Sequence, residues 1–175
     1  MKSVCAVGAG SELVILMGLP AAGKSTIGTI HFGDSHRFYD CDSIKESHPD
    51  YDPKNPAALH VWSKGVLNEQ IETLWNWPMN AVLDSTGTDA EKVGRQVMFA
   101  KAAGMKTRLL FVTVSQEVSL ERNARRTRVV PEHVILEKAA QVTETFDLVR
   151  FMFDEVEVVD NSIENPELDD RTGAV

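Results

Sequence analysis

The sequence has few cysteines and no long apolar run, and both absences exclude classes of protein. Its two cysteines are too few for a disulfide framework, so we expect a cytoplasmic protein. No run of 18 or more apolar residues occurs, which argues against a membrane-spanning helix. Residues 1–10 carry one lysine and a short apolar patch, too little for a secretory signal. The five histidines show no metal-ligand spacing with one another or with the cysteines.

Positive charge is also scarce. The chain has 18 Lys and Arg against 26 Asp and Glu, for a net charge of −8. A protein that coats long nucleic acids by charge alone would be basic, so this class is disfavoured, although a local basic groove stays compatible with the composition. The length of 175 residues and the apolar content of 43% suit one globular domain.

Strands and helices are predicted to alternate along the chain, which is typical of a parallel sheet with helices on both faces. We therefore expect an α/β fold with a three-layer arrangement. The domain should span residues 13–160, between a flexible tail at 1–12 and an acidic, disordered tail at 161–175. Three tryptophans at apolar positions in or after the helix expected at 57–75 should pack in the core. The expected strands cover residues 13–17, 37–41, 81–84, 106–114 and 156–159.

A glycine-rich segment follows the first expected strand and matches the P-loop pattern in full, Gly-Leu-Pro-Ala-Ala-Gly-Lys-Ser at residues 18–25. Small residues let successive backbone N–H groups point at phosphate oxygens, and the helix that follows adds its positive end. Lys24 would reach the β and γ phosphates of a nucleoside triphosphate such as ATP, and Ser25 would offer its hydroxyl to Mg²⁺. The expected nucleotide-binding residues are Gly18, Ala21, Ala22, Gly23, Lys24, Ser25 and Thr26.

Acidic residues follow two of the expected strands. Asp40 and Asp42 close the second strand, where side-chain alternation lets both point toward the mouth of the sheet. They suit proton transfer from an acceptor hydroxyl, or one of them caps the next helix. Asp84 closes the third strand, where a carboxylate holds Mg²⁺ or substrate, although the residues after it also favour a simple turn.

Four arginines lie within seven residues at Arg122, Arg125, Arg126 and Arg128. Their charges would repel one another unless phosphates lay between them, and guanidinium groups suit the charge of a transferring phosphoryl group. The alternative is a solvated basic face of a helix.

Over residues 13–146 the sequence resembles the polynucleotide-kinase and zeta-toxin group of P-loop kinases. The run Arg-Asn-Ala-Arg-Arg at 122–126, with Val130, Pro131 and Val134, resembles the arginine-bearing lid of phage polynucleotide kinases. Residues 40–45, 48–52 and 83–88 are closer to zeta toxins.

The resemblance implies roles for individual residues. Asp42 would be the general base, beside Asp40 at the acceptor, and Lys45 stands where polynucleotide kinases carry an arginine. Lys24 and Ser25 would hold triphosphate and Mg²⁺. The residues implied to clamp phosphates from the lid are Arg122 and Arg126, and those implied to bind the acceptor or support the base are Asp84 and Thr86.

The expected reaction is transfer of a γ-phosphoryl group to a hydroxyl. The favoured acceptor is a nucleic acid or nucleotide, either a 5′ end or a hydroxymethylated base in DNA. One alternative is a nucleotide-sugar such as UDP-N-acetylglucosamine, as in zeta toxins, which would bring an antitoxin partner. A more distant alternative is a nucleotide-binding switch, because residues 84–87 match Asp-x-x-Gly, but no Asn-Lys-x-Asp motif follows.

Overall fold

The computed structural model describes residues 10–126 and 129–162, and within them the predicted parallel sheet is confirmed. Five strands form one sheet in the order β2-β3-β1-β4-β5, and every neighbouring pair is parallel. The strands are β1 (Glu12–Met17), β2 (Arg37–Tyr39), β3 (Ala81–Asp84), β4 (Lys106–Thr113) and β5 (Glu155–Asp160).

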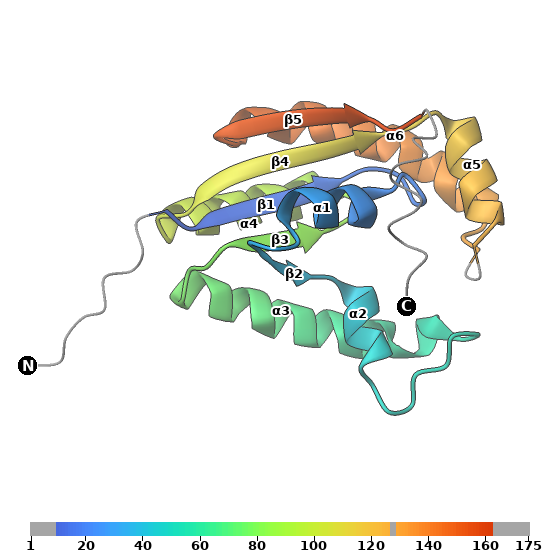
Figure 1. Ribbon diagram of the computed structural model, residues 1–175, viewed down its shortest axis with the longest axis horizontal. Coiled ribbons are helices and arrows are strands. Elements are labelled where there is room, and N and C mark those ends of the chain that lie inside the picture. Colours follow the sequence, from blue (N-terminus) through green and yellow to red (C-terminus); the bar gives the residue numbers. More distant parts are fainter. Residues whose placement is uncertain (1–9, 127–128, 163–175) are drawn as a thin grey trace, which may run out of the picture.

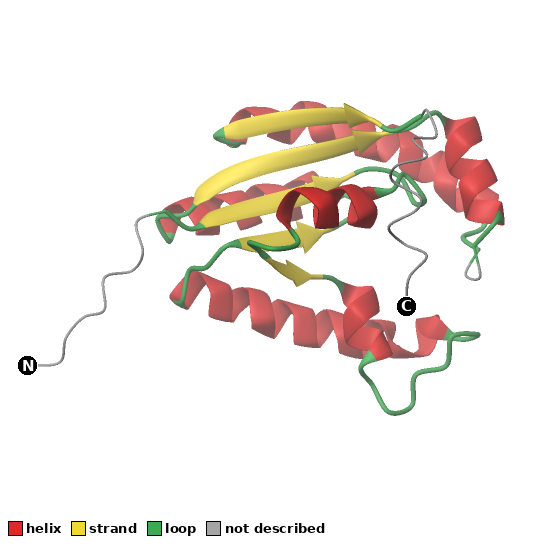
Figure 2. Ribbon diagram, viewed as in Figure 1, coloured by secondary structure: helices red, strands yellow, loops and turns green. Residues whose placement is uncertain are grey.

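Helices cover both faces of this sheet, which completes the predicted three-layer α/β fold (Figures 1 and 2). Helix α1 lies on one face, while α4 and α6 pack against each other on the opposite face. Helices α2 and α3 pack together beside the edge strand β2. The helices are α1 (Lys24–Phe32), α2 (Cys41–Glu46), α3 (His60–Asn76), α4 (Ala90–Ala102), α5 (Gln116–Ala124) and α6 (Glu132–Val149), with short 3₁₀ turns η1 (Pro56–Leu59) and η2 (Arg150–Met152).

The core is centred on β1, whose residues Leu13 to Met17 are fully buried. A continuous apolar run suits a strand covered on both faces, which is why the alternation of a half-exposed strand is missing here. On one face α1 lies so close to β1 that a Cβ at Gly28 would sit 2.6 Å from Leu16 Cδ1. On the other face Phe111 of β4 stacks on Phe146 of α6 with ring centroids 4.5 Å apart.

Several helix ends follow local rules that the sequence displays. Ser115 caps α5, as predicted, because its hydroxyl accepts a hydrogen bond from the Val118 N–H at 3.2 Å. Asp89 caps α4 in the same way through the Lys92 N–H. Gly104 follows α4 with a φ of 78°, which confirms the predicted glycine at that helix end.

Two expectations about local structure were wrong. The second strand ends at Tyr39, and α2 begins at Cys41, because Asp40 caps that helix. Of the tryptophans, Trp75 packs against the core, but Trp62 and Trp77 are exposed. The buried stripe of α3 runs through Ser63, Leu67, Ile71 and Leu74, so Trp62 falls one position outside it.

The predicted tails lie mostly outside the described residues, because residues 1–9 and 163–175 are not described. Strand β1 begins at Glu12, one residue before the predicted domain. Over 10–126 and 129–162, no helix has both the length and the apolar character needed to cross a bilayer.

Asp154 joins the edge strand β5 to the rest of the sheet. Its Oδ2 accepts hydrogen bonds from the Thr107 N–H at 2.8 Å and from Thr107 Oγ1 at 2.9 Å. Its Oδ1 accepts from Lys101 Nζ at 2.7 Å. The hydrogen bond from Lys101, followed by that from the Thr107 backbone, lowers the pKa of Asp154 from 3.8 to about 2. The ionised carboxylate therefore stabilises the folded state.

We expect Asp154→Ala to lower the free energy of unfolding by about 1–3 kcal/mol, because Thr107 is buried and would lose its partner. The pKa of Asp154 is depressed on folding, so its contribution is present above pH 3.8 and is lost as the pH falls toward about 2. Urea unfolding at several pH values tests this. The control Asp50→Ala removes an exposed carboxylate, and an equal loss in both variants would contradict the prediction.

Candidate active site

The P-loop leaves the carboxyl end of β1 and curls back to begin α1. Gly18, Ala21 and Gly23 have φ angles of 149°, 58° and 83°. Only glycine suits position 18, because a Cβ there would lie 2.3 Å from the Val112 carbonyl oxygen. Ala21 is the non-glycine residue with a positive φ in the described chain, a conformation that costs roughly 1–2 kcal/mol. The loop is therefore a strained turn that leads directly into the N-terminus of α1.

Lys24, the first residue of α1, folds back over this loop. Its Nζ donates hydrogen bonds to the carbonyl oxygens of Gly18 at 3.1 Å and Leu19 at 2.9 Å. Burial lowers the pKa of Lys24, and the negative charge of Asp84 acts in the opposite direction. The positive charges of Arg126 and Lys138 lower the pKa of Lys24 further.

Ser25 and Asp84 bring the P-loop and the end of β3 together. The Ser25 hydroxyl donates a hydrogen bond to Asp84 Oδ2 at 2.7 Å. Burial raises the pKa of Asp84, while Lys24 and the Ser25 hydrogen bond lower it, and the charges of Asp40 and Asp42 raise it. The contact between Ser25 and Asp84 thus joins the P-loop to the end of β3.

The donor set at this point suits magnesium. Hydroxyl and carboxylate oxygens are hard ligands, and a Mg²⁺ ion at a nucleotide site takes its remaining ligands from phosphates and water. The described residues contain no group of three or more His, Cys, Asp or Glu side chains arranged for a metal, and a nucleotide-bound Mg²⁺ does not need one. Ser25 and Asp84 are the residues that would hold the ion.

Asp40 and Asp42 have different environments. Asp40 Oδ1 accepts a hydrogen bond from the Ser43 N–H at 2.7 Å, so this residue is a helix cap. Asp42 lies in the first turn of α2, with its side chain 59% exposed, and it accepts a hydrogen bond from Lys45 Nζ at 2.9 Å. Lys45 itself is only 3% exposed. The expectation that both aspartates project the same way from a strand was wrong, because the strand ends before them.

The arginine cluster is divided among several roles. Arg125 pairs with Glu121 one helical turn away, so its charge is balanced within α5. Arg126, just beyond α5, is the arginine whose charge acts on Lys24. Arg122 lies half-buried in the last turn of α5, and its charge is not among those that shift Lys24. Arg128 lies outside the described residues. The prediction that mutual repulsion among all four requires phosphate is therefore too strong.

Sequence reasoning missed residues that reach the site from far along the chain. Lys138 of α6 supplies a second cation near Lys24, and no motif marks it. Ser119 and Asn161 contact P-loop carbonyl groups from 99 and 139 residues away. The backbone carbonyl of Thr86 accepts a hydrogen bond from the Gly18 N–H at 3.3 Å, and the role predicted for its side chain at the acceptor stays a prediction.

Asn123 closes the segment between α5 and α6. Its Nδ2 donates to the Val130 carbonyl at 2.8 Å, and its Oδ1 accepts from the Val130 N–H at 3.0 Å. Because Asn123 is buried, these two hydrogen bonds join the end of α5 firmly to Val130, shortly before α6.

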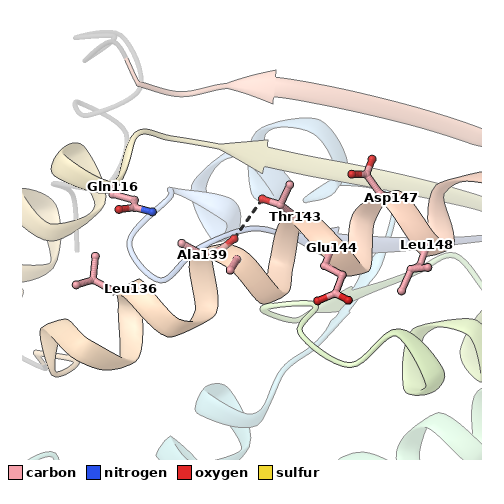
Figure 3. A pocket seen from close by; sticks show the side chains of 8 residues that line it. Gln116, Leu136, Ala139, Thr143, Glu144, Asp147 and Leu148 are labelled. Atoms are coloured by element: carbon pink, nitrogen blue, oxygen red, sulfur yellow. Dashed lines mark hydrogen bonds between the residues drawn. The ribbon is translucent and has the colours of Figure 1, made fainter.

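A groove of about 660 Å³ lies elsewhere, along the outer surface of α6 (Figure 3). Leu136, Thr143, Glu144 and Asp147 are among its lining residues, and Thr143 Oγ1 donates back to the Ala139 carbonyl. None of the predicted site residues lines it, and its carboxylates disfavour a polyphosphate. The groove is separate from the P-loop site.

Comparison with known families agrees with this geometry. A family model described as an AAA domain (AAA_33) matches residues 13–149, which include the P-loop, Asp42, Asp84 and Arg126. The chain belongs to this family. No curated protein gives a significant match to this AAA_33 chain.

Solved structures share its fold at low sequence identity. A structure of the PezAT toxin–antitoxin system of Streptococcus pneumoniae aligns with a TM-score of 0.71 and 16% identity, over 88% of this chain and 69% of that chain. A chain of the Pnkp1/Rnl/Hen1 RNA repair complex aligns at 0.62 and 15%, over 83% of this chain and 48% of that one. Deoxyadenosine kinase from M. mycoides with bound dATP aligns at 0.57 and 15%, over 91% and 96%. The resemblance to P-loop kinases is confirmed at the level of the fold, and the AAA_33 chain spans about half of the RNA-repair chain.

We expect Lys24→Ala to weaken Mg²⁺-dependent ATP binding by roughly tenfold or more, because it removes a charged hydrogen-bond donor from the phosphate site. Calorimetric titration with ATP and magnesium measures the effect. Lys64→Ala, which removes an exposed lysine of α3, is the matched control. Equal affinity of the Lys24 variant and the parent would contradict the assignment of the P-loop.

Proposed function

We propose that this protein is an ATP- and magnesium-dependent kinase that transfers a γ-phosphoryl group to a hydroxyl on a nucleic acid or nucleotide. One observation carries the proposal. The Ser25 hydroxyl of the P-loop donates a hydrogen bond to Asp84 Oδ2 at the end of β3 at 2.7 Å, and Lys24 Nζ folds back over the same loop onto the Gly18 and Leu19 carbonyls. The P-loop and a carboxylate therefore lie side by side at the carboxyl edge of the sheet, where ligands of open α/β folds bind, which supports a site for polyphosphate and metal there.

The triphosphate would be held by the P-loop. The amides of the loop, the N-terminus of α1 and the Lys24 ammonium all favour anionic oxygens. Ser25 and Asp84 would hold Mg²⁺, which neutralises phosphate charge when bound. In the described structure the hydroxyl and the carboxylate already lie 2.7 Å apart, so they are preorganised as neighbours.

Asp42 is the better of the two aspartates for a general base. Asp40 is engaged in capping α2, whereas Asp42 is more than half exposed and its orientation is fixed by Lys45. In the proposed step the acceptor hydroxyl gives its proton to Asp42 while its oxygen forms a bond to the γ phosphorus. The bond from that phosphorus to the β–γ bridging oxygen breaks, and ADP leaves. A general base of this kind typically accelerates the reaction by about 10²–10⁴-fold.

Cations from the other side of the site would stabilise the transferring group. The charges of Arg126, just beyond α5, and Lys138 of α6 lower the pKa of Lys24, and Arg122 lies in the last turn of α5. Negative charge spreads over the phosphoryl oxygens during transfer, and positive groups held in place stabilise it without reorganising.

The acceptor is proposed from the resemblance of the lid segment to polynucleotide kinases. Lys45 occupies the place of their arginine, but it is buried against Asp42, so it is better placed to orient the base than to bind an exposed phosphate.

A zeta-toxin-like kinase of a nucleotide-sugar, with an antitoxin partner, is the second candidate, favoured by the likeness of residues 40–45 and 83–88. A panel of acceptors with γ-labelled ATP separates the two: 5′-hydroxyl oligonucleotides, DNA with 5-hydroxymethyluracil, and UDP-N-acetylglucosamine. Label on the sugar alone would overturn the nucleic-acid assignment, and hydrolysis without label transfer would indicate a switch.

We expect Asp42→Asn to keep ATP affinity while slowing phosphoryl transfer by on the order of a hundredfold or more, because the amide cannot take the proton. Turnover and binding are measured separately on the same preparation. Asp147→Asn changes an exposed carboxylate of α6 and serves as the control. Equal turnover of the Asp42 variant and the parent would remove Asp42 from the mechanism.

A further inference from the structure

Two side chains outside every recognised motif hold carbonyl groups of the P-loop. The buried Ser119 hydroxyl of α5 donates a hydrogen bond to the Pro20 carbonyl oxygen at 2.8 Å. The Asn161 amide, just beyond β5, donates from Nδ2 to the Ala22 carbonyl oxygen at 2.9 Å. These two carbonyl groups flank Ala21, the residue held at a φ of 58°.

The direction of a carbonyl group decides the direction of the next amide. In a trans peptide the C=O and N–H bonds point in opposite directions, and the described chain contains no cis peptide bond. A Pro20 carbonyl held outward by Ser119 therefore aims the Ala21 N–H the other way. An Ala22 carbonyl held by Asn161 does the same for the Gly23 N–H.

Those two amides are available for a ligand. Within the described chain, neither the Ala21 N–H nor the Gly23 N–H donates to another group of the protein. The Ala22 N–H, by contrast, is used by the Leu19 carbonyl at 3.2 Å. The carbonyl groups that Ser119 and Asn161 hold thus belong to the peptide units whose amides stay open to phosphate oxygens.

Both donors are themselves held firmly. Ser119 is 0% exposed within α5, and Asn161 continues the β4–β5 ladder through its own N–H, which donates to the Thr113 carbonyl at 2.9 Å. A Cβ at Gly23 would lie 2.5 Å from Asn161 Nδ2, so the asparagine and the glycine fit each other closely. The next residue, Ser162, accepts a hydrogen bond from the Ser115 N–H at 3.3 Å.

We infer that Ser119 and Asn161 are positioning residues that orient the phosphate-binding amides of the P-loop. This inference rests on the proposed function, since it concerns the same nucleotide site. The two residues do not touch the reacting atoms. They hold a strained loop in the one conformation in which its amides face the polyphosphate, so the loop need not reorganise on binding.

Binding of Mg·ATP and of inorganic tripolyphosphate to the full chain tests this. Each hydrogen bond has a typical net worth that corresponds to a roughly threefold to tenfold change in affinity, so we expect Ser119→Ala and Asn161→Ala each to raise both dissociation constants by about that factor. The two ligands should be affected equally, because both are held through their phosphates. The KM for the acceptor should stay unchanged.

Two matched controls separate positioning from general stability. Ser63→Ala removes another fully buried helical hydroxyl, which donates to the His60 carbonyl within α3. Asn76→Ala removes a side-chain amide that donates to the Glu72 carbonyl. Both should leave the dissociation constants at the parent value, even where Tm falls. Ser119→Cys, nearly equal in volume and a weaker donor, covers the case in which Ser119→Ala fails to fold, and it should bind less tightly than the parent.

Parent-like affinity for tripolyphosphate in folded Ser119→Cys and Asn161→Ala would overturn the inference and leave the proposed kinase intact. Loss of affinity in Ser63→Ala equal to that in Ser119→Ala would overturn it as well, because general destabilisation would explain both. If the parent protein binds neither ligand, the proposed function fails, and this inference fails with it.

Discussion

The register between β1 and β3 is the constraint on which the site depends. Parallel pairing sets Leu16 opposite Asp84, so the strand that leads into the P-loop ends beside the strand that delivers the carboxylate. The Ser25–Asp84 hydrogen bond follows from that placement. A slip of one residue would turn Asp84 toward the other face of the sheet and separate it from Ser25 and Lys24. The buried apolar run of β1 prevents such a slip, since both of its faces are packed. Core packing and chemistry are therefore linked through one pair of strands.

Much of the fold could be predicted because its signals are local. The apolar runs predicted the strands, and the P-loop pattern predicted the first turn. Ser115 and Gly104 predicted helix ends that the structure confirms. The failures also have physical causes. At Asp40, helix capping competes with strand extension, and the side-chain hydrogen bond to the Ser43 N–H decides in favour of the helix. The hydrogen bonds of Ser119 and Asn161 to the P-loop, and the effect of the Lys138 charge on the pKa of Lys24, depend on tertiary packing over a hundred or so residues, which no local pattern encodes.

The sequence predicts the nucleotide side of the site better than the acceptor side. On the nucleotide side the backbone does the binding, so glycines and a helix start are visible in the sequence. On the acceptor side, recognition rests on the exposure of a few side chains. Asp42 and Lys45 are three positions apart, yet one is largely exposed and the other almost fully buried. The residues around them in the sequence do not predict this difference in exposure. The fold shared with toxin, RNA-repair and nucleoside-kinase structures does not identify the acceptor.

Asn161 lies beyond the point where the family match stops. That match ends at residue 149, whereas β5 runs to Asp160 and the asparagine that reaches back to the P-loop follows it directly. A truncation at the family boundary would remove an edge strand and a support of the nucleotide site, although every motif residue would still be present. The part of the chain that supports the nucleotide site is therefore longer than the family match, since it includes the hydrogen bond from Asn161 to the Ala22 carbonyl.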